Sequence, residues 1–187
     1  MRRYAPAILL LVLLSGCADS TTAPESGNDQ NLLSNGSFER EGEASLEGWR
    51  VADPTVVELA DDPGPAGGDH SLCVHASWLP PSGFVWAPVP GVRNGDVLTA
   101  STWMKVGGEH WLPPSFTLFV GQDPLNAGMG TSKVATTDST DWTLLEIVDT
   151  ITLGATDSVY IVLRGPACET CPHGMACFDL VQVTKTP

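Results

Sequence analysis

The sequence predicts an all-β protein built as a β-sandwich, and three observations support this. Short runs rich in valine, leucine, threonine and aromatic residues alternate with clusters of glycine, proline and aspartate. No stretch of ten residues has the apolar spacing of three and four that an amphipathic helix requires. The 187 residues include 19 glycines and 15 prolines, which favours many turns and argues against a helical bundle. About nine strands at regular spacing are typical of a sandwich.

The first sixteen residues have the pattern of a targeting segment. Arg2 and Arg3 precede an apolar run at residues 7–14, which is too short to span a bilayer core of about 30 Å. The last leucine of this run begins the sequence Leu-Ser-Gly-Cys, which ends at Cys17 and resembles the bacterial lipobox. The resemblance implies that residues 1–16 are a lipoprotein signal peptide and that Cys17 is acylated, with palmitate among the expected chains. An ordinary secretory signal with a coincidental cysteine is the alternative.

Residues 17–30 comprise the predicted lipidation site, Cys17, and a polar segment rich in serine, threonine, proline, glycine and acids. This composition predicts a disordered tether, because it offers too little apolar surface to offset the entropy of ordering. More than one acyl chain gives stable anchoring, so we expect an exported protein held on the cell envelope. Ala18 after the cysteine makes the outer membrane plausible where one exists.

The charge balance is strongly acidic. Nine lysines and arginines face 22 aspartates and glutamates, for a formal charge of −13, and removal of residues 1–16 would take away two arginines and no acid. A continuous basic face for phosphate contacts is therefore excluded, and with it nucleic-acid binding. Coulomb repulsion also disfavours polyanionic glycans, so a neutral glycan is expected if the ligand is a carbohydrate.

Seven runs carry the clearest strand pattern along the chain. They are Ser71–Trp78, Phe84–Pro90, Asp96–Val106, Ser115–Gln122, Trp142–Leu153, Ser158–Gly165 and Met175–Lys185. Residues 91–96 and 138–141 consist of turn-forming types. We expect one domain over residues 31–187, acting as a monomer.

Five motifs in sequence order resemble carbohydrate-binding modules of the family 4/9 type. The motifs are N-L-L-S-N-G-S-F-E at 31–39 with Gly48-Trp49, G-D-H-S-L-C-V at 68–74, V-L-T-A-S-T-W-M-K-V at 97–106, Trp142-Thr143 and F-D-L-V at 178–181. The resemblance covers nearly all of residues 31–187. It implies a jelly roll of the galactose-binding-domain-like type, and it is less specific for ligand than for fold.

The same resemblance implies a structural calcium ion. In such modules the ion joins the first and last strands. Carried over, its carboxylate ligands are Glu39 and Asp179, with main-chain carbonyls around Ser37, Gly68 and Ser71. Oxygen donors of this kind suit Ca²⁺, which takes six to eight of them. Leu180 departs from the family pattern, where many relatives have a second aspartate. Without calcium, the two carboxylates would be solvated or bonded to turn amides.

Aromatic residues are the candidate ligand contacts, since sugar rings pack on aromatic faces. Period two over residues 97–106 sends Leu98 and Met104 to the core and Trp103 to the opposite face. The same alternation over Phe84–Pro90 sends Trp86 outward. Three further candidates fall in predicted loops, namely Trp78, His110 and Trp111. Which sheet each strand joins is not determined at this stage.

Four cysteines remain besides Cys17: Cys73, Cys168, Cys171 and Cys177. An exported protein folds where thiols are oxidised, so two disulfides are expected, with Cys73 paired to one of the other three. A Cys₃His zinc site and a reactive C-x-x-C pair are the alternatives.

No nucleophile elbow or zinc-protease motif is present, and a catalytic set does not emerge. The sequence therefore predicts a non-catalytic, lipid-anchored protein that binds a glycan at the cell envelope. The rival hypothesis is an interaction lipoprotein that contacts another envelope protein and no sugar.

Overall fold

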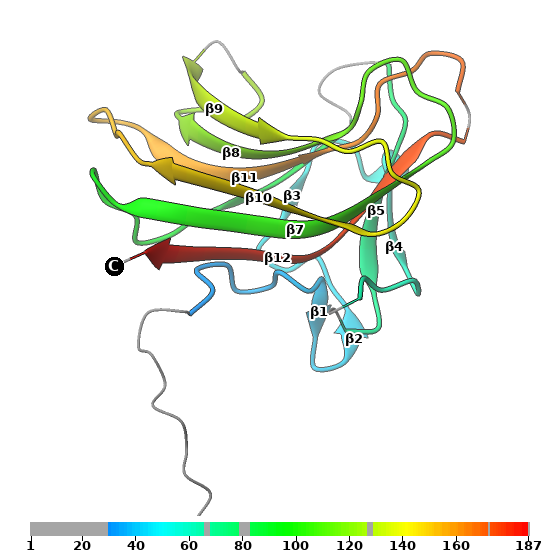
Figure 1. The fold of residues 1–187 in the computed structure, drawn as a ribbon, viewed down its shortest axis with the longest axis horizontal. Coiled ribbons are helices and arrows are strands. Elements are labelled where there is room, and N and C mark those ends of the chain that lie inside the picture. The colour runs from blue at the N-terminus through cyan, green and yellow to red at the C-terminus, as the bar shows by residue number, and fades with distance from the viewer. Residues whose placement is uncertain (1–29, 66–67, 79–82, 127–128, 172, 187) are drawn as a thin grey trace, which may run out of the picture.

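The computed structural model describes residues 30–65, 68–78, 83–126, 129–171 and 173–186. Two five-stranded sheets face each other, and a two-stranded sheet formed by β1 (Glu39–Arg40) and β2 (Glu43–Ala44) lies beside them (Figure 1). The predicted signal peptide, Cys17 and residues 17–29 of the predicted tether lie outside the described residues. In the described part, none of the helical segments is both long and apolar enough to traverse a bilayer.

The first large sheet, here the β7 sheet, is antiparallel throughout. Its strand order is β10 (Thr143–Thr150), β7 (Val97–Gly107), β12 (Met175–Thr186), β5 (Ser71–His75) and β4 (Val57–Ala60). A 3₁₀ turn, η1 (Pro54–Val56), precedes β4.

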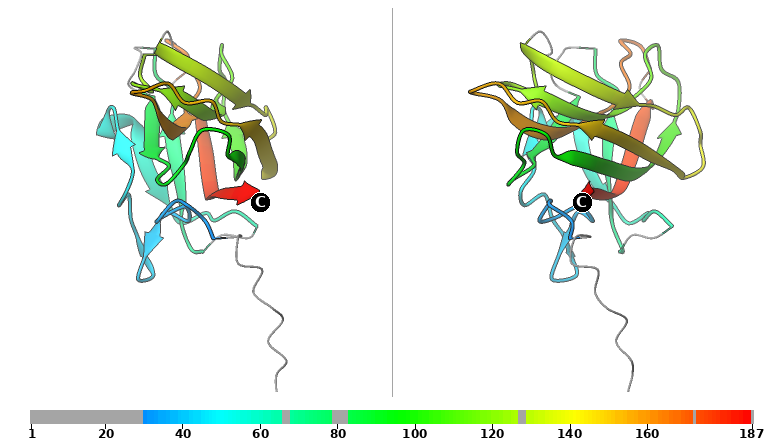
Figure 2. Two further views of the ribbon diagram at one scale, coloured as in Figure 1. Left: turned by 90° about the vertical axis from the view of Figure 1, so that its left-hand side faces the viewer. Right: turned by 60° about the vertical axis from the view of Figure 1, so that its left-hand side comes forward.

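The second large sheet, here the β8 sheet, is also antiparallel. Its order is β3 (Arg50–Val51), β6 (Phe84–Pro88), β11 (Ser158–Arg164), β8 (Ser115–Gly121) and β9 (Gly130–Ala135). From β5 to β12 the chain crosses repeatedly between the sheets, and the two turned views show their stacking (Figure 2). The protein is a β-sandwich of jelly-roll type, as the sequence predicts.

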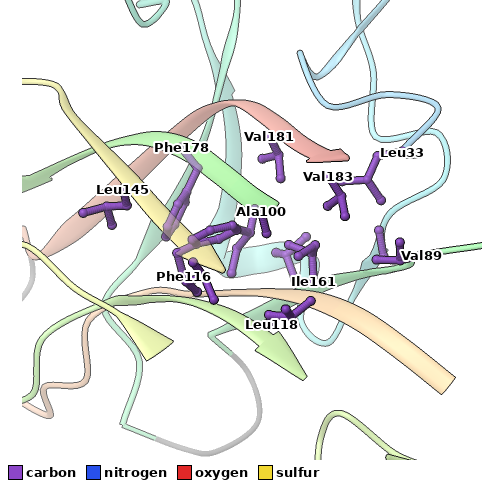
Figure 3. Close-up of a cluster of buried hydrophobic side chains, with 14 of the residues drawn as sticks. Leu33, Val89, Ala100, Phe116, Leu118, Leu145, Ile161, Phe178, Val181 and Val183 are labelled. Atoms are coloured by element: carbon purple, nitrogen blue, oxygen red, sulfur yellow. The ribbon is translucent and has the colours of Figure 1, made fainter. Parts of the chain in front are cut away.

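The core lies between the two sheets and is built from alternate residues. In β7, Leu98, Ala100, Thr102, Met104 and Val106 are buried while their neighbours are half-buried, so the predicted inward face is correct. The β8 sheet contributes residues such as Phe116, Leu118 and Ile161 to the same cluster (Figure 3). Both sheets therefore keep a second, outward face free of the core.

The N-terminal segment is fastened to the last strand. The side-chain amide of Asn31 donates to the carbonyl of Val181 at 2.9 Å, and its oxygen accepts from the amide of Val183 at 2.9 Å. Buried Asn35 donates to the carbonyl of Ser45 and accepts from the amide of Glu39, both at 2.9 Å. These side chains hold the turn that carries Glu39 against the end of the sandwich.

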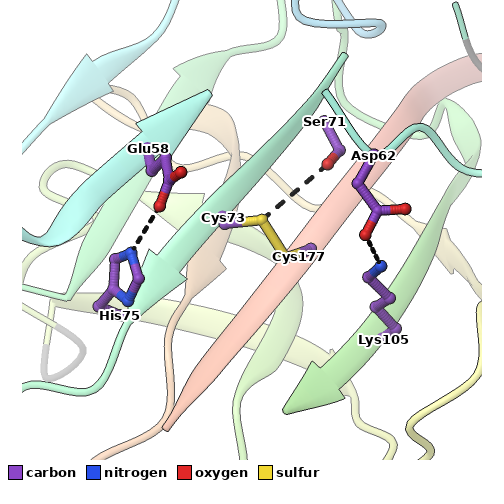
Figure 4. Close-up of a disulfide and its surroundings, with 7 residues drawn as sticks. All are labelled: Glu58, Asp62, Ser71, Cys73, His75, Lys105 and Cys177. Atoms are coloured by element: carbon purple, nitrogen blue, oxygen red, sulfur yellow. Dashed lines mark hydrogen bonds and ion pairs between the residues drawn. A yellow bond between two sulfur atoms is a disulfide. The ribbon is translucent and has the colours of Figure 1, made fainter. Parts of the chain in front are cut away.

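All four cysteines of the domain form disulfides. Cys73 on β5 and Cys177 on β12 are direct cross-strand partners, and their sulfurs are joined (Figure 4). Cys168 and Cys171 close a short loop before β12. This is the expected pattern of one long-range and one local bridge. It leaves no thiolates for the alternative Cys₃His zinc site.

Candidate functional site

A groove runs over the outward face of the β8 sheet. It has a volume of about 350 Å³, and its floor and walls come mainly from β6, β8, β9 and β11. The lining side chains used below are Phe84, Leu112, Ser115, Thr117, Phe119, Val134, Val162 and Arg164. Neither an aspartate nor a glutamate is among the described residues that line it.

Strand register fixes the floor of the groove. Directly opposed residues of antiparallel strands point to the same face. One such row crosses the whole sheet and consists of Arg50, Trp86, Val162, Thr117 and Val134. Trp86 is half-buried in this row. It therefore lies on the groove face, one strand away from Val162 in the floor.

Two further rows flank the first. On one side Pro88, Tyr160, Phe119 and Ser132 are in register, and the rings of Phe119 and Tyr160 lie 6.3 Å apart between centroids. On the other side Phe84, Arg164 and Ser115 are in register, and the Arg164 guanidinium carbon lies 5.6 Å from the centre of the Phe84 ring. The face thus combines aromatic surfaces, hydroxyl groups and arginine side chains.

Two predicted loop aromatics come together at one end of the groove. Trp78 and Trp111 form an edge-to-face pair with centroids 5.6 Å apart, and each is at least half exposed. Trp111 precedes Leu112, which lines the groove, and Trp78 borders a small hollow together with Phe84 and Arg164. The pair therefore extends the aromatic surface beyond the sheet.

His110 is held differently from these tryptophans. Its Nε2 lies 3.2 Å from the Asp138 carboxylate, and the side chain is largely covered. The structure gives it a partner within the loop and does not place it in the groove wall.

Trp103 lies on the other side of the molecule. It belongs to β7, in the sheet opposite Trp86, and the loop carrying Gly64 packs over it, since a methyl group at Gly64 would come within 3.3 Å of its Cβ. Both tryptophans point outward from their sheets, as the alternation predicts. They do not share one binding face, because the sheets they belong to are stacked back to back.

The two predicted calcium carboxylates lie near each other, with Asp179 inside β12 at the point where the register of that strand shifts. Asp179 is fully buried; its oxygens accept from the amide of Gly64 at 2.7 Å and from that of Leu180 at 2.6 Å. Burial raises the pKa of Asp179 above its ordinary value, the two amide bonds oppose this, and the nearby Glu39 charge raises it further. Glu39 accepts from the amides of Asp69 and His70.

The backbone around these carboxylates is unusual. Phe38, which precedes Glu39, and Leu180, which follows Asp179, both have left-handed φ values, at 58° and 47°. Such conformations cost non-glycine residues of order 1 kcal/mol or more and recur at functional sites. The register of β12 also shifts between Asp179 and Gln182.

The predicted carbonyl donors lie in the same region of the chain fold. Gly68 packs so closely on Glu39 that a side chain at Gly68 would overlap the carboxylate. Ser37 precedes Phe38, and buried Ser71 begins β5. Among the described residues no group of three histidine, cysteine, aspartate or glutamate side chains is arranged to hold a metal. A cation here would therefore depend on two carboxylates and main-chain oxygens.

Sequence reasoning missed most of the groove. Phe119 was hidden because it lies in the apolar run at residues 118–120, where alternation does not separate the groove side of β8 from its core side. Arg164 carried a usable signal. It alternates with buried Leu163 and Ile161 and so must face outward.

Comparison with protein-family models and with curated proteins finds no match. Solved structures do match over most of the chain. One described as a family 16 carbohydrate-binding module has a TM-score of 0.57 at 16% identity, covering 82% of this chain and 99% of the other.

Two further structures match in the same way. A CBM22-2 xylan-binding domain from Paenibacillus barcinonensis Xyn10C has a TM-score of 0.59 at 17% identity, covering 81% of this chain and 98% of the other. TmCBM61, solved with β-1,4-galactotriose, has a TM-score of 0.51 at 17% identity, covering 84% and 99%. At these identities the likeness establishes the jelly-roll fold that carbohydrate-binding modules use.

Proposed function

We propose that this protein is a non-catalytic carbohydrate-binding module whose ligand lies in the groove of the β8 sheet. The observation that carries the proposal is the groove itself, where aromatic and hydroxyl side chains line an open face of about 350 Å³. An exposed concave surface of this composition is typical of a ligand site. The likeness to carbohydrate-binding modules supports the same reading.

The chemistry of the lining suits a sugar chain. The C–H faces of pyranose rings pack on aromatic side chains such as Phe84 and Phe119. Hydroxyl groups of Ser115 and Thr117 and the Arg164 guanidinium can then bond to sugar hydroxyls. Since the protein carries a formal charge of −13, the chain it binds is chiefly neutral.

A structural calcium ion between Glu39 and Asp179 is part of the proposal. Two neighbouring carboxylates, one of them fully buried, repel each other unless a cation or a proton intervenes. Glu39 belongs to the N-terminal segment and Asp179 to the last strand, so a cation there would fasten both ends of the domain together.

We further propose that acylation of Cys17 anchors the protein to the cell envelope, with residues 17–30 as the tether. The described chain begins at the far half of β12, where Asn31 bonds to Val181 and Val183. The Trp78–Trp111 pair lies at the opposite end, before the start of β12, where the main-chain amide of Trp111 donates to the carbonyl of Ala167. An anchor at Cys17 would thus leave the aromatic end directed away from the membrane.

The proposal is tested by affinity electrophoresis and calorimetry of the purified protein against a panel of soluble polysaccharides with calcium present. We expect dissociation constants in the micromolar to millimolar range for at least one neutral polysaccharide. Trp86→Ala removes an aromatic side chain from the groove face and weakens binding, whereas Trp103→Ala on the opposite face leaves it unchanged. If the folded protein binds none of the polysaccharides in the panel, the proposal is overturned.

One observation favours a second function. Leu144 and Val148 are more than half exposed on the outward face of β10, an edge strand of the β7 sheet. Exposed apolar residues on an edge strand are typical of a protein contact. If the polysaccharide panel is silent, an interaction lipoprotein that uses this edge becomes the better account.

A further inference from the structure

The groove has a charge unlike that of the rest of the molecule. The chain carries 22 acidic residues against nine basic ones, yet the three rows that form the groove face contain no aspartate or glutamate. The same rows hold two arginines, Arg50 and Arg164, and Arg164 lines the groove directly. The groove face of this acidic protein is thus locally cationic.

Among the described lysines and arginines, Arg164 alone is half-buried without a carboxylate partner. The others that lack one are exposed, namely Arg50, Arg93 and Lys133. Arg40, Lys105 and Lys185 each pair with a carboxylate, from Glu47, Asp62 and Asp96 respectively. For Arg164, the described residues supply no carboxylate, and the ring of Phe84 is the group its guanidinium faces. The side chain is half-buried between that ring and the groove.

A half-buried, unpaired guanidinium is costly to desolvate unless a ligand supplies its counter-charge. Its planar fork matches a carboxylate in two parallel hydrogen bonds, and stacking on an aromatic ring fixes the plane of the fork. The hydroxyl of Ser115, in register with Arg164, lies on the same face and can donate to the same anion.

We propose that Arg164 forms a carboxylate subsite, so that the glycan bound is a chiefly neutral chain bearing occasional carboxylate groups, as on uronic acid substituents. This inference rests on the proposed carbohydrate-binding function. It agrees with the net charge, because Arg164 contacts a single carboxylate at close range, whereas a charge on every sugar would meet the acidic surface beyond the groove.

The test compares polysaccharides that differ only in their carboxylates. One pair is xylan with its glucuronate side groups and the same xylan after chemical reduction of the carboxyls. The other pair is hydroxyethylcellulose before and after sparse oxidation at C6. By calorimetry and affinity electrophoresis at low salt, we expect the carboxylated member of at least one pair to bind about ten-fold more tightly, as a charge-assisted bidentate contact predicts.

Variants assign that preference to Arg164. Arg164→Gln abolishes the difference within the pair, and Arg164→Lys retains part of it. Lys133→Gln removes the same charge from β9, where Lys133 is opposite core residue Leu118, and keeps the preference. Should Arg164→Gln fail to fold, the salt dependence of the wild-type protein takes its place, with the advantage of the carboxylated member falling as salt rises.

The outcomes separate this inference from the proposed function. Equal binding of both members, unchanged by Arg164→Gln or by salt, would overturn the carboxylate subsite and leave carbohydrate binding intact. Binding of no member of either pair, together with silence across the wider panel, would overturn both.

Discussion

Gly36 shows how one missing side chain lets the two ends of the chain meet. Its carbonyl accepts from the amide of Val181 at 2.7 Å. A methyl group at Gly36 would overlap the carbonyl oxygen of Val181. The backbones approach so closely that no larger residue fits without moving the last strand. The glycine of the N-L-L-S-N-G-S-F-E motif is therefore a packing requirement.

Gly36→Ala is expected to lower the free energy of unfolding by about 3 kcal/mol, because the obstacle is rigid backbone. Gly42→Ala is the control. It has open space around it and pays only for its left-handed φ, about 1 kcal/mol. Thermal melts followed by circular dichroism measure both. Equal losses in the two variants would contradict this account of Gly36.

At the residue scale, alternation alone predicted which way many side chains point. It placed Trp86 and Trp103 outward and the alternate residues of β6 and β7 inward, as observed. It could not place the two tryptophans relative to each other, because sheet membership depends on pairings between distant segments. The register Arg50–Trp86–Val162 joins segments more than 100 residues apart.

At the scale of elements, the two disulfides constrain very different lengths of chain. Cys73 and Cys177 are separated by 104 residues and link β5 to the last strand, whereas Cys168 and Cys171 are three residues apart. Restriction of the unfolded chain predicts a stabilisation of about 4.7 kcal/mol for the long loop and about 2 kcal/mol for the short one.

Removing the bridges pairwise tests this difference. Cys73→Ala with Cys177→Ala should lower the melting temperature more than Cys168→Ala with Cys171→Ala, measured by calorimetry under non-reducing conditions. A larger effect of the local pair would contradict the chain-entropy argument, and would mean that the loop before β12 is the more important constraint.

Seven of the twelve described strands were predictable, and β1, β2, β3, β4 and β9 were not. The seven predicted runs match β5, β6, β7, β8, β10, β11 and β12 within a few residues. β1, β2 and β3 have two residues each, too few for any periodicity, and β9 is exposed along nearly its whole length, so it lacks an apolar stripe. These four strands are defined by hydrogen bonds to the strands beside them, which sequence periodicity does not show.

At the scale of the whole molecule, the proposed calcium site would link stability to pH through Asp179. Because the pKa of Asp179 is raised in the folded protein, the calcium-free fold is favoured by this group when it is protonated. That contribution is fully present below the ordinary value of 3.8 and is lost as the pH rises through the raised pKa. Calcium requires the ionised carboxylate, so calcium and protons compete.

The expected result is a melting temperature that falls on chelation at pH 7 and changes progressively less toward pH 4. Asp179→Asn should abolish the calcium response, whereas Asp149→Asn on the edge strand β10 should keep it. Differential scanning fluorimetry with calcium or EDTA over this range measures the effect. A melt at pH 7 that EDTA leaves unchanged would remove calcium from the account.

The meeting of the chain ends was suggested by motif resemblance, whereas the groove was not predictable as a whole. Its middle row takes one residue each from β3, β6, β11, β8 and β9. The shape of that surface follows from the register of four strand pairs, and all but β8–β9 join segments that are distant in sequence.

The central claim, that the β8 sheet binds the glycan, is tested most directly by mapping amide chemical shifts of the labelled protein during titration with a fragment of a polysaccharide that binds. We predict saturable shifts at Thr117, Val134 and Val162 in the groove. Thr99 and Thr184, paired on the β7 sheet, should stay unchanged. Shifts confined to the β7 sheet would contradict the account and place the ligand on the opposite face.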